Sequence, residues 1–291
     1  MSKWLALLAL CFALPAFAQR PDLLEVVEIS GEISESTASQ VSQAVEGINE
    51  NPKIKAVLLI VKSPGGGVSA SAEIYAALSR LKAPVVGWCD YLCASGGIYV
   101  MMSPGVKFVA LTDQAITGSV GVMAQITRFN RLLEWLKIDN DVYKSGGLKS
   151  AGNPTQEPTE AERKYLQGLV DEFASRFYGV VRKARPKLTD WEGIKSARIF
   201  IGEEAVKAGL VDAVMDRAGA IKKAKELSGS KNIYTREELK KMSRAADDRS
   251  SYGFSPSPIP VFGDVPWLIE ALKEIRRGET VRFSYRMPYE F

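Results

Sequence analysis

A serine among small residues is the first feature of this chain that suggests chemistry. Ser95 lies in the string Ala94-Ser95-Gly96-Gly97, at the start of an apolar run of small residues. Such a serine suits a nucleophile, because neighbouring backbone N–H groups can point at a developing oxyanion. The 291 residues include no histidine, so a Ser-His-Asp triad is excluded. The base for Ser95 is then a lysine in its neutral form or, as the weaker alternative, a carboxylate.

Four lysines near turns are candidates for that base: Lys62, Lys107, Lys144 and Lys149. A lysine that is neutral near pH 7 needs its pKa lowered from ~10.4 to ~7, which costs about 4–5 kcal/mol of differential interaction. Lys149 differs from the others because it lies in a glycine-containing loop, 144–150, that follows a predicted strand. That loop can fold over a site, or it can be an ordinary solvated surface loop. Spacing alone does not separate the four lysines.

Two further turns carry small residues that could complete a site. Ser63-Pro64-Gly65-Gly66-Gly67 follows a predicted buried strand and precedes a helix, so its N–H groups could form half of an oxyanion hole. The alternative is a tight turn that binds no ligand. The segment has neither the Rossmann spacing nor the phosphate-loop spacing of nucleotide-binding motifs. Thr117-Gly118-Ser119-Val120-Gly121-Val122 is the other turn, in which Ser119 could orient a neutral lysine or simply end a strand.

The elements that must position these turns alternate along the chain. Continuous apolar runs separated by helical patterns predict an α/β fold with a mostly parallel sheet flanked by helices on both faces. Successive turns at the carboxyl ends of parallel strands lie side by side, so the turn at 65–67 and Ser95 should meet. The predicted strands are 23–29, 54–61, 84–88, 106–110 and 142–143, and the predicted helices are 36–48, 68–81, 94–102, 159–185, 203–208 and 218–227.

The ends of the chain differ from its middle. Residues 1–18 predict a signal peptide, with Lys3, an apolar stretch and the small-x-small site Ala16-Phe17-Ala18. An uncleaved anchor is the alternative, although the stretch is too short to span a bilayer as a helix. We therefore expect an exported protein that is periplasmic or extracytoplasmic. Its association with the membrane stays open at this point. A domain over 19–230 precedes a C-terminal region, 231–291. This region contains a linker rich in Ser, Pro, Asp and Arg at 244–260, an amphipathic helix near 267–275 and a tail.

Charge and cysteine content narrow the function further. The net charge is +4 without a basic block, so the sequence predicts no nucleic-acid partner. Cys89 and Cys93 would pair in an exported protein only if a turn separates them, because an extended strand places them ~13 Å apart. Two buried, apolar thiols is the favoured interpretation.

Four segments in one order resemble the Ser/Lys peptidases of the signal peptide peptidase A family, in its short, single-repeat form. A closing unit at 202–212 also matches, and the resemblance covers roughly residues 23–227. It implies a crotonase/Clp-like spiral of βαβ units. It also implies Ser95 as nucleophile, Lys149 as general base and Ser119 as the residue that orients this base, with oxyanion N–H groups from Gly65, Gly66 and Gly96. The four segments are 63–67, 94–97, 117–122 and 144–149.

The resemblance also implies what the protein acts on. Such an enzyme is a serine endopeptidase that hydrolyses signal peptides or unfolded membrane-proximal segments through an acyl-enzyme, with no cofactor and no metal. Its partners would be peptide or protein substrates and further copies of itself, with peripheral membrane contact. The alternatives are a catalytically silent scaffold or binding module of this fold and a coenzyme A enzyme with the same oxyanion geometry. Lys62, beside the first glycine turn, departs from the uncharged residue usual in the family.

Overall fold

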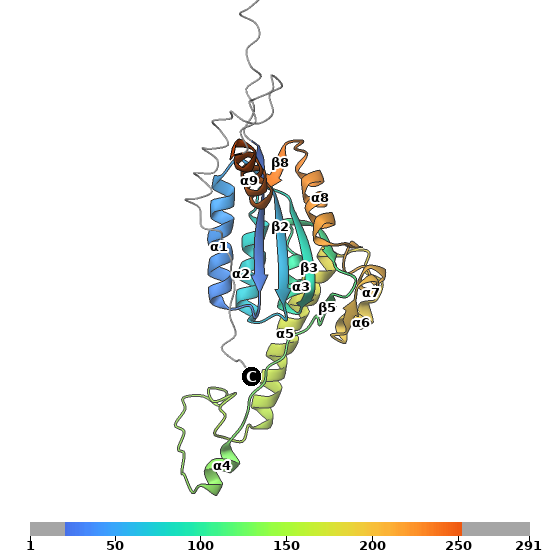
Figure 1. Ribbon diagram of the computed structural model, residues 1–291. Helices are drawn as coiled ribbons and strands as arrows, with labels where there is room; N and C mark the ends of the chain where they lie inside the picture. Colours follow the sequence, from blue (N-terminus) through green and yellow to red (C-terminus); the bar gives the residue numbers. More distant parts are fainter. Residues whose placement is uncertain (1–20, 252–291) are drawn as a thin grey trace, which may run out of the picture.

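A mostly parallel sheet of eight strands forms the centre of the part of the chain that the structure describes (Figure 1). The structure is a computed structural model that describes residues 21–251, with side chains to residue 244. The strands run in the order β6-β5-β3-β2-β1-β8, while β4 pairs with β3 and β7. Every pairing is parallel except that of β5 with β6. The predicted fold class is confirmed.

The strands are β1 (Asp22–Ser30), β2 (Ile54–Ser63), β3 (Val85–Ala94), β4 (Val106–Leu111), β5 (Ile116–Gly118), β6 (Ile199–Ile201), β7 (Ala213–Val214) and β8 (Ile233–Thr235). The helices are α1 (Glu35–Glu50), α2 (Val68–Ser79), α3 (Gly96–Met101), α4 (Asn130–Trp135), α5 (Glu160–Ala184), α6 (Trp191–Lys195), α7 (Glu203–Lys207), α8 (Arg217–Ser228) and α9 (Arg236–Ser251). These bounds extend β3 through a bulge as far as Ala94, so that the strand leads directly into the Ser95 turn.

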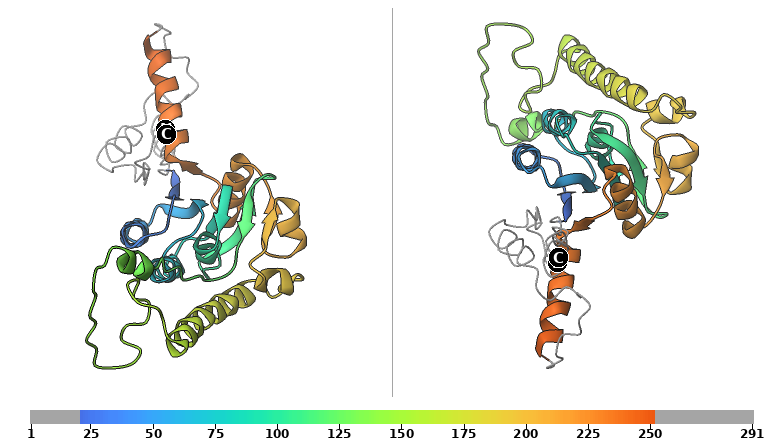
Figure 2. Two further views of the ribbon diagram at one scale, coloured as in Figure 1. Left: turned by 90° about the horizontal axis from the view of Figure 1, so that it is seen from below. Right: turned by 90° about the horizontal axis from the view of Figure 1, so that it is seen from above.

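The central strands are buried on both faces because helices cover both sides of the sheet. Along β2, Val57 and Leu59 belong to a core shared with α1, α2 and α3. The intervening Leu58 belongs to a second core with Ala220 and Ala224 of α8. Figure 2 shows α1 and α2 on one side of the sheet and α8 on the other. This burial on both faces explains why residues 56–61 of β2 form a continuous apolar run and do not alternate with polar residues.

Helix α5 begins far from the sheet and ends against it. Its C-terminal half packs on the domain, where Phe177 and Val181 are buried and the Phe177 ring meets Tyr99 at 4.9 Å between centroids. Its N-terminal half, together with the preceding segment that contains α4, projects beyond the carboxyl ends of the strands (Figures 1 and 2). We call residues 121–172 the arm. It exposes apolar side chains that include Met123, Trp135 and Tyr143, the last 93% exposed.

Three predicted features differ in the structure. Residues 142–143 are not a strand, because they lie in the irregular part of the arm without a neighbouring strand. The predicted domain boundary at residue 230 is too early, since β8 pairs with β1 and α9 follows it. The linker predicted from residue 244 is helical as far as Ser251.

Some predictions cannot be compared with the structure. The predicted signal peptide at 1–18 and the amphipathic helix near 267–275 lie outside the described residues. Among the described helices, none combines the length and the apolar character that crossing a bilayer requires.

Phe177 should anchor the arm to the domain. Phe177→Ala removes a side chain that is only 5% exposed, and we expect it to lower the free energy of unfolding by about 3–5 kcal/mol. Phe173, one turn earlier on α5, is 39% exposed, so Phe173→Ala should cost about 1 kcal/mol or less. Urea denaturation of both variants measures the difference. Equal losses would contradict this account of how α5 is held.

Candidate active site

Ser95 occupies a strained turn between β3 and α3. It is the residue that caps α3, with φ 49° and ψ −121°, a conformation that residues other than glycine rarely adopt. The Ser95 N–H donates to the carbonyl of Gly118 at 2.9 Å, which ties the turn to the end of β5. Such strain costs about 1–3 kcal/mol and clusters at functional sites. The half-buried Ser95 is therefore held in an unusual backbone pose by its surroundings.

The glycine turn after β2 lies directly against Ser95. A Cβ at Gly65 would stand 2.8 Å from the Cβ of Ser95 and 2.7 Å from the backbone nitrogen of Gly96. A Cβ at Gly66 would stand 2.2 Å from the carbonyl oxygen of Ile33. Both glycines also have positive φ, at +107° and +155°. The predicted meeting of the two turns is confirmed, and it requires that neither position carries a side chain.

The backbone donors of these turns are not equivalent. The Gly65 N–H donates to the Ser63 hydroxyl at 3.0 Å, so it is already committed. Of the three expected oxyanion donors, Gly65 is therefore the one whose N–H already has an acceptor. Within the described residues, the N–H groups of Gly66 and Gly96 have no recorded acceptor. The two positions are neighbours, since a Cβ on Gly96 would lie 3.3 Å from the Gly66 nitrogen. Gly66 and Gly96 are thus the donors that remain for an oxyanion.

Ser71, on the first turn of α2, is a residue that the sequence did not single out. It is 4% exposed, and its hydroxyl has no hydrogen-bond partner among the described residues. A Cβ on Gly96 would lie 2.4 Å from this hydroxyl oxygen. The only sequence signal was its place four residues after Gly67, one helical turn beyond the glycine turn. The structure therefore puts a buried hydroxyl beside the Ser95 turn.

Ser119 lies close to Ser95 because their strands pair. Ala94 of β3 is the register partner of Gly118 of β5, and each serine directly follows one of these residues. Ser119 is half-buried with φ 50°, and its N–H donates to the carbonyl of Arg198 at 3.0 Å. Ser95 and Ser119 thus lie at the same edge of the sheet.

Lys149 is not brought to these serines within one chain. It is exposed and belongs to the arm, the segment that projects beyond the end of the sheet (Figure 1). No hydrogen bond in the described part of the chain joins it to Ser95 or Ser119. At the end of the arm it lines a shallow cavity of about 330 Å³ together with Tyr143 and Asn153. The structure therefore assembles the serine side of the predicted site and leaves its lysine elsewhere.

The other three lysines have partners for their ammonium groups. Lys62 makes ion pairs with Glu28 at 3.2 Å and Asp90 at 3.4 Å. Burial acts to lower the pKa of Lys62, but these carboxylates outweigh it and the pKa is raised, which keeps the group charged. Lys107 donates to the carbonyl of Pro104 at 2.7 Å.

Lys144 is held within the arm. Its Nζ donates to the Ser150 hydroxyl at 2.6 Å and lies 3.7 Å from the Glu162 carboxylate. Of the four candidates, Lys149 is the one whose Nζ makes no recorded hydrogen bond or ion pair with the described residues. The structure thereby favours Lys149 among lysines that spacing could not separate.

Cys89 and Cys93 are free and buried in β3. The Cys93 thiol donates to the Met101 sulfur at 3.4 Å, and burial together with the neighbouring Cys89 raises the pKa of Cys93. A buried thiol of raised pKa is a poor nucleophile. The interpretation as two apolar thiols is confirmed.

Comparisons with known proteins identify relatives of the chain. Residues 77–231 match the family model of peptidase family S49, and residues 22–115 match that of Clp protease. A protein of Enterococcus faecium named signal peptide peptidase SppA is 37% identical over 188 residues, 62% of this chain and 54% of that protein. A Synechocystis protein named protease slr0021 is 33% identical over 206 residues, 70% of this chain and 73% of that protein.

A solved structure is also similar to this chain. It is that of the 1510-N membrane-bound stomatin-specific protease, with a TM-score of 0.48 and 17% sequence identity, covering 70% of this chain and 84% of that one. Among the sequence relatives, the extent of the match varies. The chain spans about half the length of the Enterococcus faecium protein and about three quarters of the Synechocystis protein.

The glycine turn should tolerate a methyl group at one position and not at its neighbour. Gly66→Ala places a Cβ against the Ile33 carbonyl at positive φ, so we expect the free energy of unfolding to fall by about 1–3 kcal/mol or more. Gly67 has φ −58° and only ordinary contacts at 3.6 Å and beyond, so Gly67→Ala should change it by less than about 0.5 kcal/mol. Thermal or urea unfolding compares the pair. An unaffected Gly66→Ala variant would refute the close contact.

Proposed function

Because the chain belongs to peptidase family S49, a family of serine peptidases, we propose that it is an exported serine endopeptidase with a Ser95/Lys149 dyad. Its substrates in this proposal are signal peptides or unfolded membrane-proximal segments. The name of the Enterococcus faecium relative supports the signal peptides. The observation that carries the proposal is the strained Ser95 turn. It lies against Gly65, with the N–H groups of Gly66 and Gly96 beside it.

The chemistry follows from these groups. The Ser95 Oγ attacks the carbonyl carbon of the scissile peptide bond while its proton passes to the Lys149 Nζ. The N–H groups of Gly66 and Gly96 stabilise the oxyanion of the tetrahedral intermediate. The intermediate collapses to an acyl-enzyme, and the leaving amine takes the proton from Lys149. Water then attacks the acyl carbon, gives its proton to Lys149 and releases the acid, after which the proton returns to Ser95.

The remote position of Lys149 makes assembly part of the proposal. The arm exposes Trp135, Tyr143 and other large apolar side chains, and exposed apolar surface of this kind marks interaction sites when it is contiguous. A homo-oligomer would cover them and would bring the arm of one copy to the Ser95 turn of a neighbour. Ser119, beside Ser95, is then placed to accept a hydrogen bond from the incoming Lys149 and orient it. Burial in that interface favours the neutral lysine that the mechanism needs.

Export and membrane contact complete the proposal. The signal-like residues 1–18 support export, and the net charge of +4 suits a surface near anionic lipid. The membrane contact in this proposal is peripheral.

Removal of either dyad residue should abolish peptide hydrolysis. We expect Ser95→Ala and Lys149→Ala each to lower kcat by about 10³-fold or more, because each carries out covalent or proton-transfer steps. Lys107→Ala is the control and should leave kcat unchanged. The assay uses signal-peptide and unfolded-protein substrates, with the cuts mapped by mass spectrometry. A serine-reactive or peptide-boronate probe should label the wild type and not Ser95→Ala. Full activity in either dyad variant would contradict the Ser95/Lys149 assignment. A wild type that neither cleaves these substrates nor is labelled would favour the silent scaffold.

Mixing the two inactive variants tests assembly. If the dyad forms between copies, co-refolded Ser95→Ala and Lys149→Ala chains should recover activity, to about a quarter of wild type with random mixing of copies. Each variant alone should stay inactive. Failure to recover, with mixed oligomers demonstrated by differential tagging, would show that the dyad does not form between copies.

The pH dependence follows from the identity of the base. A lysine must lose its proton before it can accept one from Ser95, so kcat should fall as the pH is lowered and the base becomes charged. With no histidine in the chain, this acid limb cannot belong to an imidazole. Rate profiles of wild type measure it, and metal chelators should leave it unchanged. A rate that is independent of pH from 5 to 9 would contradict a lysine base.

A further inference from the structure

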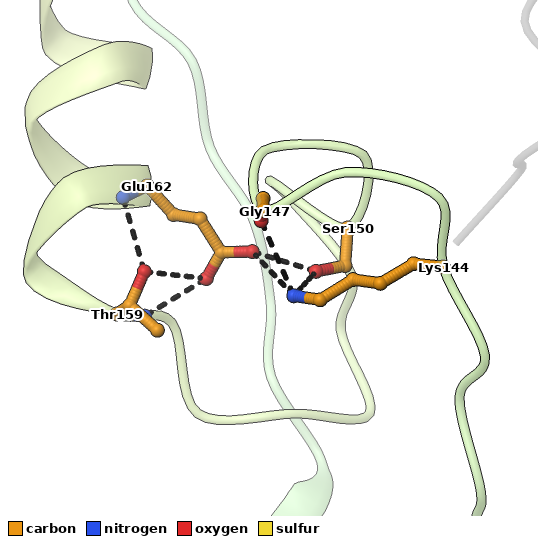
Figure 3. A network of polar contacts seen from close by, with 5 residues as sticks. All are labelled: Lys144, Gly147, Ser150, Thr159 and Glu162. Atoms are coloured by element: carbon orange, nitrogen blue, oxygen red, sulfur yellow. Dashed lines mark hydrogen bonds and ion pairs between the residues drawn. The ribbon is translucent and has the colours of Figure 1, made fainter.

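A buried carboxylate joins the base loop to the start of α5. Glu162, on the first turn of that helix, is 3% exposed although it lies in the otherwise open arm. Figure 3 shows its two oxygens facing different neighbours. Oε2 accepts from the Thr159 N–H at 2.8 Å and from its hydroxyl at 3.1 Å. Oε1 accepts from the Ser150 hydroxyl at 2.6 Å and pairs with Lys144 at 3.7 Å.

Only half of this arrangement is explained by helix capping. A capping box needs the contacts of Thr159 with Glu162, which satisfy free N–H groups at the helix start. The contacts of Oε1 reach 12 residues back along the chain, to the loop that precedes the helix. There, Lys144 closes the group by donating to the Ser150 hydroxyl at 2.6 Å and to the carbonyl of Gly147 at 3.2 Å. We call Lys144, Ser150 and Glu162 the clasp.

The clasp keeps its charge over the working range of pH. The Ser150 hydroxyl, followed by the N–H and hydroxyl of Thr159 and the charge of Lys144, lowers the pKa of Glu162 to about 2. Because the folded pKa lies below the ordinary value, the stabilisation is complete above about pH 4.5 and is lost as the pH falls toward 2. A change of pH between 5 and 9 therefore leaves the Glu162 carboxylate as it is.

The clasp acts one residue away from the proposed base. Lys149 directly precedes Ser150, and the Lys149 N–H donates to the Gly146 carbonyl at 3.1 Å within the same turn. The next turn is closed by the Asn153 N–H, which donates to the Ser150 carbonyl at 2.8 Å. Fixing the Ser150 hydroxyl thus fixes the backbone from which the Lys149 side chain leaves. Within the clasp, the contacts with Gly147, Ser150 and Glu162 occupy the ammonium group of the neighbouring Lys144.

We propose that Glu162 is a positioning residue for the general base, acting through Ser150 to hold the loop that presents Lys149. The proposal rests on the proposed Ser95/Lys149 function. The loop that presents Lys149 lies on a projecting arm with few buried apolar residues. The buried carboxylate of Glu162, on the nearest helix, therefore holds this loop in place. Glu162 touches neither substrate nor the reacting atoms. Its contribution is geometric, and a misplacement of about 1 Å can cost about 10²-fold in rate.

Two single-residue variants separate positioning from capping. Ser150→Ala removes the hydroxyl that Oε1 holds and leaves the cap intact. We expect kcat to fall about 10–100-fold, with KM unchanged, a shifted acid limb in the pH profile and faster amide exchange over residues 144–153. Thr159→Ala removes the capping hydroxyl and leaves the Ser150 and Lys144 contacts. It should lower the thermal stability of the protein, with kcat and the acid limb as in wild type.

Ser150→Thr and Glu162→Gln complete the series. Ser150→Thr keeps a hydroxyl and should restore most of the rate lost in Ser150→Ala. Glu162→Gln loses the charge that pairs with Lys144 and one acceptor for Thr159, so it should show both the kcat loss and the lower stability. All measurements use the full chain, with the oligomeric state checked by light scattering. Wild-type kcat in Ser150→Ala, or an equal kcat loss in Thr159→Ala, would overturn the positioning role.

Lys149→Ala in the same assay tells the two proposals apart. If Lys149→Ala is inactive while Ser150→Ala is fully active, the positioning role fails and the dyad stands. If Lys149→Ala is itself active, the proposed function fails, and the positioning role with it.

Discussion

Direct backbone contact between two turns is the constraint on which the candidate site depends. The Cα of Gly65 approaches the Ser95 turn so closely that a Cβ would meet both Ser95 and Gly96. This approach brings the free N–H groups of Gly66 and Gly96 beside one another. It also requires parallel strands β2 and β3 that end at one edge of the sheet, with a bulge that extends β3 to Ala94. The parallel register from Val57–Val85 to Val61–Cys89, followed by the pairing of Ser63 with Cys93, brings the two strand ends to that edge.

The strained pose of Ser95 is stabilised by the same contacts. Its positive φ is unfavourable by itself, but the Ser95 N–H bond to Gly118 and the packing of Gly65 leave the turn little alternative. Ser119 follows from this pairing, since Ala94 and Gly118 are register partners. Ser95, the N–H groups of Gly66 and Gly96, and Ser119 therefore lie on turns that are joined by direct backbone contacts. The buried hydroxyl of Ser71 lies against these turns without a recorded partner in the described region.

The arm is stabilised by other interactions than the sheet. It has few buried residues, exposes many large apolar side chains and is fixed to the domain through Phe177 and Val181. Within it, local order comes from the polar clasp at Glu162 rather than from a hydrophobic core. Because Lys149 lies on the arm and Ser95 at the edge of the sheet, the proposed dyad is incomplete in an isolated chain. In the proposed oligomer the site forms only where copies meet, which restricts hydrolysis to the assembled state.

Sequence alone determined the sheet class, the chemistry class and the turns. The periodicity of apolar residues, the positions of glycines and the lack of histidine can all be read directly from the sequence. They predicted the strand near 54–61, the Ser95 turn and a lysine as the favoured base. The sequence could not predict β8, because this three-residue strand is defined by its pairing with β1. It also could not show that the Ser63 hydroxyl accepts the hydrogen bond of the Gly65 N–H. The partners of Lys62, Lys107 and Lys144 and the contacts of Glu162 with the loop before α5 were likewise visible only in the tertiary structure. The reason is that the environment and the orientation of a side chain depend on residues that are distant in sequence, which a local sequence pattern does not identify.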